Sequence, residues 1–218
     1  MLNCNVALVN MPLIQRGVSP AKTYHHVDLR TTLLEAAVAL IGEVGPRAFT
    51  LREVARRAGV SHNAPYRHFA GKDELLAAVA AEGFDRLTAA MERAMKPGRT
   101  PLERLQLCGC GYVDFALRWP LHLLVMFDLP APARNDCETV GGNAFHVLLG
   151  CITAAQASGD LAPGDPLPQA WTAWSLVHGI AKLATSGNLP LGRRATLEFT
   201  RAATQAMYVG VAVKKKPR

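Results

Sequence analysis

The sequence lacks the features that mark several large classes of protein. Stretches in which apolar and polar residues alternate, as in a half-buried β-strand, are absent. No apolar run is long enough to cross a membrane, and the first residues lack the basic start and cleavage site of a secretory signal. Aromatic residues make up only 6% of the 218 residues, yet 50% are hydrophobic, enough for a core. The composition predicts an all-α protein of one or two domains in the cytoplasm.

Motifs for catalysis and metal binding are missing as well. The chain has no phosphate-binding loop, no G-x-S-x-G, no H-E-x-x-H and no other paired catalytic motif. Its 5 cysteines, an odd number, show no zinc-ligand spacing. Cys108 and Cys110 would point about 200° apart on a helix, which makes a poor chelate and a poor disulfide. We expect no catalytic residue, metal or cofactor and buried reduced thiols, with a redox or metal sensor as the alternative.

Positive charge is concentrated in two places. The formal net charge is +7 and the pI about 9.4. Residues 50–72 hold 5 basic residues against 1 acid, and residues 214–218 form a basic tail. Charge gathered in this way favours contact with a polyanion over a uniformly basic surface. For the tail alone, a disordered and solubilising segment is the preferred interpretation.

Residues 50–72, TLREVARRAGVSHNAPYRHFAGK, read as two short helices joined by a tight turn. Thr50 and Glu53 form a capping box, in which each side chain satisfies a free backbone N–H at the helix start. Gly59 stands where the first helix must end, because glycine adopts a positive φ without steric cost. Ser61 is a suitable N-cap for a second helix over residues 62–69. Two such helices among basic residues predict a helix-turn-helix that enters the DNA major groove.

Hydrophobic periodicity predicts seven further helices, about nine in all. The first covers residues 29–44, with Asp28 as its cap and a buried stripe that includes Val44. A long helix over residues 71–95 links the DNA-binding part to the rest. The remaining helices, separated by glycine or proline, are expected at 101–118, 121–129, 138–157, 169–185 and 194–211.

Three strings follow one another between residues 24 and 82: DLRTTLLEAAVALIGEVG, FTLREVARRAGVS and PYRHFAGKDELL. In order and spacing they resemble the tetracycline-repressor (TetR/AcrR) family of bacterial regulators. Pro65 departs from the pattern, since many members carry leucine there, and proline removes an early helical hydrogen bond if Ser61 is the cap. WSLVHG, residues 174–179, is similar to the Trp-His-Gly signature of one subgroup of the family's C-terminal domains.

The resemblance implies an N-terminal three-helix domain that binds DNA and a C-terminal helical domain for ligand binding and dimerisation. The expected division is an extension at 1–23, the helix-turn-helix domain at 24–72 with a linking helix at 71–96, the C-terminal domain at 97–213 and the tail at 214–218.

Roles on DNA follow from positions in the family's motif. The start of the supporting helix and the end of the segment are expected on phosphates, and the recognition helix on bases. Asn63 has the geometry to bind adenine in bidentate fashion, and Arg67 to take guanine or phosphate. The expected DNA-binding residues are Thr50, Arg52, Ser61, His62, Asn63, Ala64, Tyr66, Arg67, His68 and Lys72.

Alternatives stay open inside this segment. Phe69 is expected in the core, and core packing is also an alternative for Tyr66. For Arg56 and Arg57, a solvated face is as good an interpretation as DNA contact.

The last two helices are too apolar for solvent on all sides, which predicts a homodimer surface. The dimer would place two recognition helices in successive major grooves of an inverted repeat, with half-sites roughly 34–36 Å apart. The alternative is that these helices only close an intramolecular core.

By resemblance, a small ligand of unknown identity binds inside the C-terminal domain and shifts the equilibrium away from DNA. The two histidines among the candidates would orient it, and ordinary core packing is the alternative for each residue. The candidates are Cys108, Tyr112, Phe115, Trp119, Met126, Phe127, Phe145, His146, Leu149, Trp174 and His178. The expected function is a ligand-released repressor, with an activator or a non-specific DNA-binding protein as alternatives and an enzyme excluded.

Overall fold

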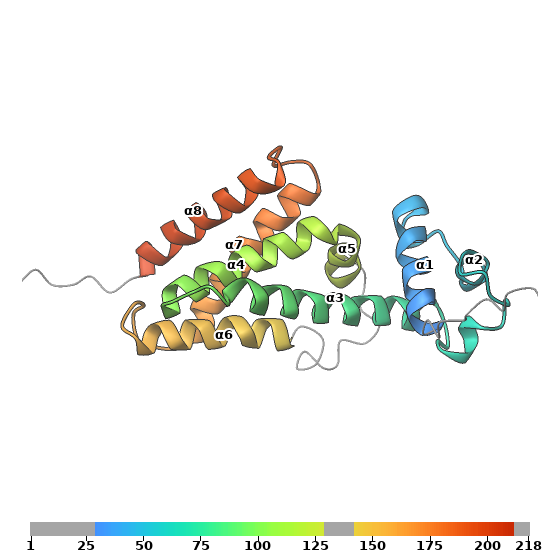
Figure 1. Cartoon of the computed structure of the whole chain (residues 1–218), viewed down its shortest axis with the longest axis horizontal. Coiled ribbons are helices and arrows are strands. Elements are labelled where there is room, and N and C mark those ends of the chain that lie inside the picture. Colours follow the sequence, from blue (N-terminus) through green and yellow to red (C-terminus); the bar gives the residue numbers. More distant parts are fainter. Residues whose placement is uncertain (1–28, 129–141, 212–218) are drawn as a thin grey trace, which may run out of the picture.

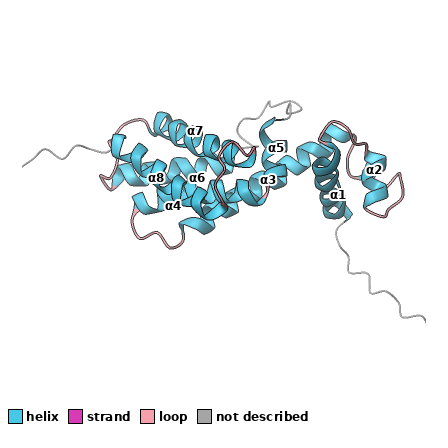
Figure 2. Ribbon diagram, turned by 90° about the horizontal axis from the view of Figure 1, so that it is seen from above, coloured by secondary structure: helices cyan, strands magenta, loops and turns pink. Residues whose placement is uncertain are grey.

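The computed structural model describes residues 29–128 and 142–211, where every regular element is a helix (Figures 1 and 2). The elements are α1 (Leu29–Val44), α2 (Leu51–Arg57), the 3-10 turn η1 (Pro65–Arg67), α3 (Lys72–Met95), α4 (Pro101–Arg118), α5 (Pro120–Asp128), α6 (Gly142–Ala157), α7 (Pro166–Thr185) and α8 (Arg193–Val211). The prediction of an all-α fold is confirmed. Among the described helices, none combines the length and apolarity needed to cross a bilayer.

Most helix bounds agree with those expected. α7 begins earlier than predicted, at Pro166, because the Asp165 carboxylate caps it by accepting from the Leu167 N–H at 3.0 Å. The prediction that Val44 is buried is wrong. Its side chain is 52% exposed, since it ends α1 beyond the packed face. The predictions for Asp28, for residues 1–23 and 138–141 and for the basic tail concern residues outside those that the structure describes.

A small core holds the N-terminal part together. Phe49 and Val54 are both buried in it, one on each side of the start of α2. The capping box predicted there is present: the Thr50 N–H donates to Glu53 Oε2 at 2.7 Å, and the Glu53 N–H donates to Thr50 Oγ1 at 3.3 Å. The Thr50 hydroxyl also donates to Glu53 Oε2, at 2.9 Å. This bond and the one from the Thr50 N–H hold the pKa of Glu53 below its usual range. Local sequence signals therefore define the entry into α2.

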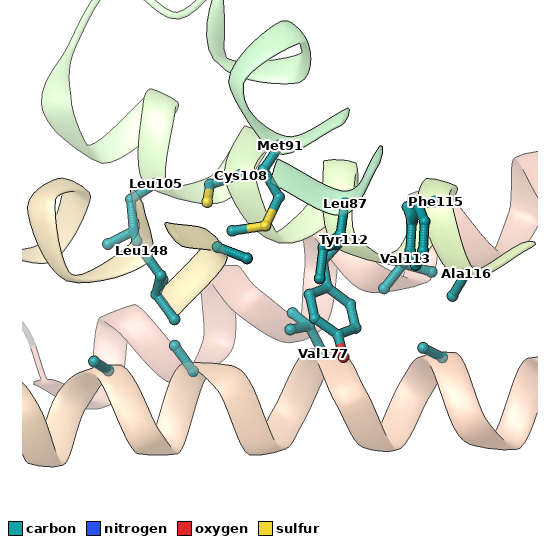
Figure 3. Packing of buried hydrophobic residues seen from close by; sticks show 14 of the residues in the cluster. Leu87, Met91, Leu105, Cys108, Tyr112, Val113, Phe115, Ala116, Leu148 and Val177 are labelled. Carbon is teal, nitrogen blue, oxygen red and sulfur yellow. The ribbon is translucent and has the colours of Figure 1, made fainter. Parts of the chain in front are cut away.

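A larger core surrounds α4, which lies among α3, α6, α7 and α8 (Figures 1 and 3). Tyr112 and Phe115 of α4 are fully buried in it, with Leu87 of α3 and Val177 of α7. Helix α3 approaches closely at Gly111, where a Cβ would stand 2.9 Å from the backbone of α3. The absence of a side chain at this position therefore sets the distance between the two helices.

Helix α5 contributes to both cores. Val125 is buried in the N-terminal core, whereas Leu123 and Met126 are buried in the larger one. The thioether of Met126 lies against α3 at Gly83, where a Cβ would come within 2.6 Å of its sulfur. The 24 residues of α3 run from the N-terminal part into the larger one, and α5 packs beside them (Figure 1). Two helices thus connect the two parts.

The inner face of α8 includes three buried threonines, which the apolar pattern did not predict. Thr196, Thr200 and Thr204 are completely buried one turn apart. Thr200 and Thr204 each donate to the carbonyl four residues earlier, at 2.8 and 2.9 Å. Because these bonds satisfy the hydroxyls within the helix, threonine packs here as a small side chain.

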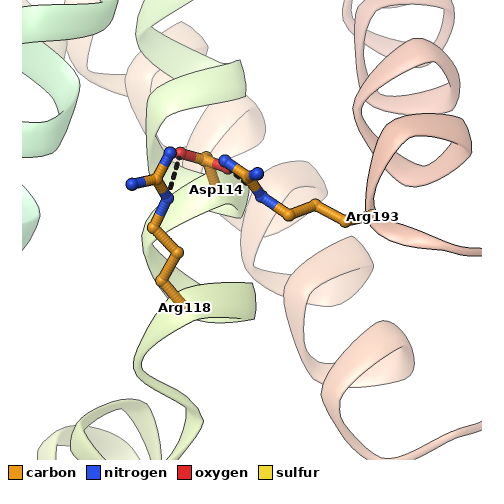
Figure 4. Close-up of polar contacts among 3 residues, drawn as sticks. All are labelled: Asp114, Arg118 and Arg193. Atoms are coloured by element: carbon orange, nitrogen blue, oxygen red, sulfur yellow. Dashed lines mark hydrogen bonds and ion pairs between the residues drawn. The ribbon is translucent and has the colours of Figure 1, made fainter.

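An ion cluster fixes the start of α8 against α4 (Figure 4). Arg193 Nε donates to Asp114 Oδ1 at 2.8 Å, while Arg118 Nε lies 2.9 Å from Asp114 Oδ2. A cation at a helix N-terminus is unfavourable by itself, and Asp114 offsets the charge of Arg193.

Candidate DNA-binding surface and effector site

The segment expected as a recognition helix is not an α-helix, and the prediction for residues 62–69 is wrong in this respect. Only the 3-10 turn η1 forms there. The Ser61 carbonyl accepts from the Ala64 N–H at 2.9 Å, one residue earlier than in an α-helix, because Pro65 has no N–H to donate. The Pro65 carbonyl accepts from the N–H groups of His68 and Phe69, at 3.0 and 2.9 Å.

The segment nevertheless has an inner and an outer face. Pro65 and Phe69, four residues apart, are buried, and Phe69 is a core residue as expected. The prediction that Ala64 contacts DNA is wrong, because its side chain is buried on this inner face. The outer face presents the exposed side chains of Ser61, His62, Asn63, Tyr66 and Arg67, and His68 is half-buried beside them.

The arginines of α2 differ in what they touch. Arg52 and Arg56 are exposed. Arg57 makes a two-point ion pair with Glu43 of α1, with Nη1 and Nη2 each 2.5 Å from a carboxylate oxygen. The pair raises the pKa of Arg57 and lowers that of Glu43. Arg57 therefore links α2 to α1, and Arg52 and Arg56 remain the candidates for phosphate contact.

Lys72 has a structural contact that the sequence did not reveal. Its Nζ donates to the carbonyls of Arg47 and Phe49, at 2.8 and 2.9 Å, and lies 4.4 Å from the centre of the Phe49 ring. The first residue of α3 is thereby tied to the loop that precedes α2. An ammonium has three donors, so one remains available for a phosphate.

Five of the residues expected to bind a ligand meet in one aromatic cluster. They come from four helices: Tyr112 of α4, Phe127 of α5, Phe145 of α6, and Trp174 and His178 of α7. Trp174 lies at its centre, with ring centroids 5.0 Å from Tyr112, 5.7 Å from Phe145 and 6.4 Å from Phe127. Phe127 also stacks edge-on against His178 at 4.7 Å. The packing of these four helices thus brings five of the eleven expected residues together.

One polar pair lies inside this cluster. The hydroxyl of Tyr112 and Nδ1 of His178 are 2.8 Å apart. Burial raises the pKa of Tyr112, so its hydroxyl keeps the proton. The hydroxyl donates to Nδ1 when that nitrogen carries no proton, which leaves Nε2 of His178 as the protonated nitrogen.

The other candidates do not belong to the aromatic cluster. Cys108, Phe115 and Met126 are buried in the surrounding core, and Leu149 packs against it. The ring centroid of Trp119 lies 5.6 Å from that of Phe115 and 5.7 Å from the guanidinium carbon of Arg86. The prediction that His146 lines the ligand site is wrong. His146 is exposed, because the inward face of α6 contains its neighbour Phe145 and not His146.

Sequence reasoning missed His122, a buried histidine between the two parts. It lies on α5, and its Nε2 is 3.5 Å from Glu82 of α3, without a hydrogen-bond partner among the described residues. Burial and the nearby charge of Arg86 lower the pKa of His122, against the opposite effect of Glu82. Its place in the apolar string LHLLVMF was the available signal.

A separate groove of about 690 Å³ lies between the α3–α4 connection and α8. Gln106 and Gln205 hydrogen-bond across it. Its lining mixes both signs of charge with apolar atoms, and it shares no residue with the aromatic cluster. The residues that line it are Pro97, Gly98, Arg99, Glu103, Gln106, Leu107, Glu198, Arg201, Ala202 and Gln205.

Two family profiles match the chain. The profile described as bacterial regulatory proteins, tetR family, matches residues 33–79, and the profile described as a tetracyclin repressor-like C-terminal domain matches residues 105–207. The first match contains α2 and η1, and the second contains all five residues of the aromatic cluster and the WSLVHG string.

Curated and solved relatives agree with these matches. The HTH-type transcriptional repressor KstR of Rhodococcus jostii (strain RHA1) is 40% identical over 80 residues, which are 37% of this chain and 37% of that protein. The matched region thus spans little more than a third of this curated relative. A solved protein of unknown function from Rhodococcus sp. RHA1 is 37% identical, with a TM-score of 0.76 over 88% of this chain and 100% of its own.

A further solved structure shows the fold alone. The transcriptional regulator FadR of Bacillus subtilis, in complex with stearoyl-CoA, has a TM-score of 0.72 at 18% identity, over 83% of this chain and 98% of its own.

Proposed function

This chain belongs to the TetR family of bacterial regulatory proteins, and we propose that it is a dimeric, sequence-specific repressor that a small ligand releases from an inverted-repeat operator. The family consists of transcriptional regulators and not of enzymes. The observation that carries the proposal is the exposed polar face of the recognition segment. This segment follows the capped helix α2, and its buried inner face packs into the core.

On DNA, the recognition segment reads bases and its surroundings bind phosphate. Asn63, Tyr66 and Arg67 are all exposed on the outer face of this short segment, and all three are proposed to enter the same groove. Asn63 binds adenine through its amide, and Arg67 binds guanine or phosphate. Arg52 and Lys72 flank the segment and supply phosphate contacts that do not depend on sequence.

The dimer forms through α7 and α8. One stripe of α8, opposite the buried threonines, is exposed and apolar, and Leu183 of α7 is also exposed. A continuous apolar face of this kind is unusual on a monomer. The exposed residues of this face are Phe199, Ala202, Ala206 and Val209.

The effector binds at the aromatic cluster. Its walls are aromatic and its Tyr112–His178 pair offers hydrogen bonds, which suits a mainly apolar ligand with a polar group. FadR, which shares this fold, holds stearoyl-CoA, and a ligand with a long apolar portion is the chemical class we propose here. Phe127 belongs to the cluster and to α5, and α5 also contributes Val125 to the N-terminal core. Movement of α5 therefore couples the ligand to the DNA-binding part.

Selection of bound duplexes from a random DNA pool at physiological salt tests the proposal. We expect an enriched inverted repeat with half-sites about 10 base pairs apart. Salt-sensitive binding without enrichment would overturn sequence specificity and favour a non-specific DNA-binding protein. Transcription from the selected operator in a reporter then separates repression from activation.

A matched pair of arginines tests the DNA face itself. Arg52→Ala should weaken all duplexes and reduce the salt dependence of binding by about one phosphate contact. Arg57→Ala should leave this slope nearly unchanged, because Arg57 is paired with Glu43. Equal slopes for the two variants would contradict the proposed placement of phosphate contacts.

A further inference from the structure

A buried histidine lies where helix α5 packs against the linking helix α3. His122 of α5 is 5% exposed, and its Nε2 has no hydrogen-bond partner among the described residues. Buried polar atoms in folded proteins are hydrogen-bonded almost without exception, so an unpaired one needs an explanation. The neighbours of His122 in the string LHLLVMF are apolar, and an apolar side chain would fill its place without an unpaired nitrogen. Packing alone therefore does not account for this histidine.

The carboxylate nearest to His122 is already engaged by a guanidinium. Glu82 and Arg86 both lie on α3, and Arg86 Nη2 donates to Glu82 Oε1 at 2.6 Å. The other carboxylate oxygen, Oε2, lies 3.5 Å from His122 Nε2, beyond the usual length of a hydrogen bond. Glu82 therefore neutralises Arg86 first, and it supports a proton on His122 less than a free carboxylate would.

Helices α1 and α4 also pack against α5. On the α1 side the contact is apolar, because a Cβ at Gly42 would stand only 3.1 Å from the side chain of Leu121. At the end of α4, Arg118 pairs with Asp114 at 2.9 Å, so its charge is offset. The charges that act on His122 are thus the two from α3.

The burial of His122 depends on the distance between α3 and α5. A Cβ at Gly83 of α3 would stand 3.4 Å from His122 Cβ and closer still to Met126, so only glycine permits this approach. Burial lowers the pKa of His122 and the charge of Arg86 lowers it further, against the effect of Glu82. A proton on His122 therefore favours an open arrangement, in which α5 stands further from α3 and water reaches the imidazole.

We propose that the proton is a second effector of this protein, and that protonation of His122 favours the open arrangement and releases DNA. This inference rests on the proposed function, in which movement of α5 couples the effector site to the DNA-binding part. Val125 of α5 is buried in the N-terminal core, so a shift of α5 changes the support of that core. Proton and ligand then favour the same arrangement, and acid lowers DNA affinity.

Linkage gives the sign and the size of the effect. Because the pKa of His122 is lower in the closed, DNA-binding arrangement, binding is undiminished above the usual pKa of 6.5 and weakens as pH falls below it. A histidine with that ordinary pKa in the open arrangement is about 90% protonated at about pH 5.5. The open arrangement therefore gains at most about tenfold over the closed one.

The affinity of the full chain for DNA, measured against pH, tests the inference. The Kd for the selected operator is measured at constant salt at about pH 8 and about pH 5.5, for the parent and for His122→Asn. The other titratable groups are the same in both chains, so their effects cancel in the ratio of the two Kd values. We expect acid to weaken the parent relative to the variant by a factor between about 2 and 10. A ratio that stays constant, or a parent that gains on the variant, would overturn the proposal.

A second variant leaves His122 in place. In Glu82→Gln, burial and Arg86 oppose protonation without the carboxylate, so the loss of affinity in acid should be as large as in the parent or larger. A smaller loss would assign the titration to Glu82 and overturn the role of His122. Glu92→Gln is the matched control, because Glu92 is exposed on the same helix, and it should reproduce the parent.

The design separates this inference from the proposed function. An enriched operator with a constant Kd ratio would leave the repressor standing and remove the proton effect. If no operator is enriched, the repressor fails, and the same ratio on a duplex of arbitrary sequence still tests His122. Absence of binding to any duplex would overturn both. Circular dichroism at the two pH values establishes that each chain is folded.

Discussion

Tyr66 and Tyr112 represent two regions of this molecule that use the same side chain differently. Tyr66 is 53% exposed on the outer face of the recognition segment, whereas Tyr112 is 1% exposed at the centre of the effector part. On the outer face of the recognition segment, the candidate base contacts Asn63, Tyr66 and Arg67 project from a core that does not need them. In the effector region, the candidates are themselves the core. Function and stability are therefore separable in the first region and coincide in the second.

The largest effect we expect tests this difference directly. Tyr112→Ala should lower the free energy of unfolding by about 3–5 kcal/mol, because it opens a cavity where four helices meet. Tyr66→Ala should change it by about 0.5 kcal/mol or less. Urea unfolding followed by circular dichroism measures both. Similar losses in the two variants would remove the distinction between the regions.

The next effect should appear in binding and not in folding. Asn63→Ala should cost about 1–3 kcal/mol on the selected operator and far less on duplexes of unrelated sequence. Its free energy of unfolding should stay within about 0.5 kcal/mol of the parent, because Asn63 is exposed. Titration of fluorescent duplexes gives the affinities. If every duplex weakened equally, Asn63 would be a backbone contact and not a reader of bases.

Two glycines sharpen the comparison at the level of the backbone. Gly59, between α2 and the recognition segment, has φ +68°, so Gly59→Ala should destabilise by about 1–2 kcal/mol. Gly150 lies inside α6, where an added Cβ meets nothing within 4 Å, so Gly150→Ala should stabilise by up to about 1 kcal/mol. Thermal unfolding of the two variants supplies the test. A stabilising Gly59→Ala would mean that the turn does not require its left-handed residue.

The smallest effect concerns pH at the junction of the two regions. The pKa of His122 is lowered from its usual 6.5 in the folded protein, mainly by burial and then by Arg86. As pH falls below about 6.5, unfolded chains take up a proton that folded chains bind only at lower pH. Stability from this residue is thus complete above that pH and is lost as pH falls toward the folded pKa.

His122→Asn should flatten this dependence. Urea midpoints between about pH 8 and pH 5.5 measure it, with the parent chain losing more stability over the acidic half than the variant. The other histidines remain in both proteins and cancel in the difference. An identical pH profile for the two chains would show that His122 titrates as freely as in the unfolded state.

The features that the sequence predicted are those set by neighbours in the chain. The Thr50–Glu53 box, the positive φ of Gly59 and the bounds of α4 depend on interactions within a few residues. The convergence of the aromatic cluster also followed, because each helix has one apolar stripe and the stripes must face each other. The family resemblance covered both regions in the right order.

The features that escaped prediction depend on partners far away in the chain. Nothing near Lys72 indicates that its ammonium binds the carbonyls of Arg47 and Phe49. Hydropathy does not distinguish the buried threonines of α8 from exposed ones, since their hydroxyls are satisfied within the helix. The sequence showed that Pro65 departs from the family's pattern. Only the hydrogen bonds of the structure show that the whole segment as far as Phe69 forms a 3-10 turn and not an α-helix.

The position of α5 has a consequence for how the molecule melts. Its nine residues supply Val125 to one core and Leu123 and Met126 to the other. If either core unfolded, α5 would lose part of its packing, and the apolar side chains that α5 supplies to the other core would lose their support. Calorimetry should therefore record a single heat-absorption peak, with the two parts behaving as one cooperative unit and not as two domains in series.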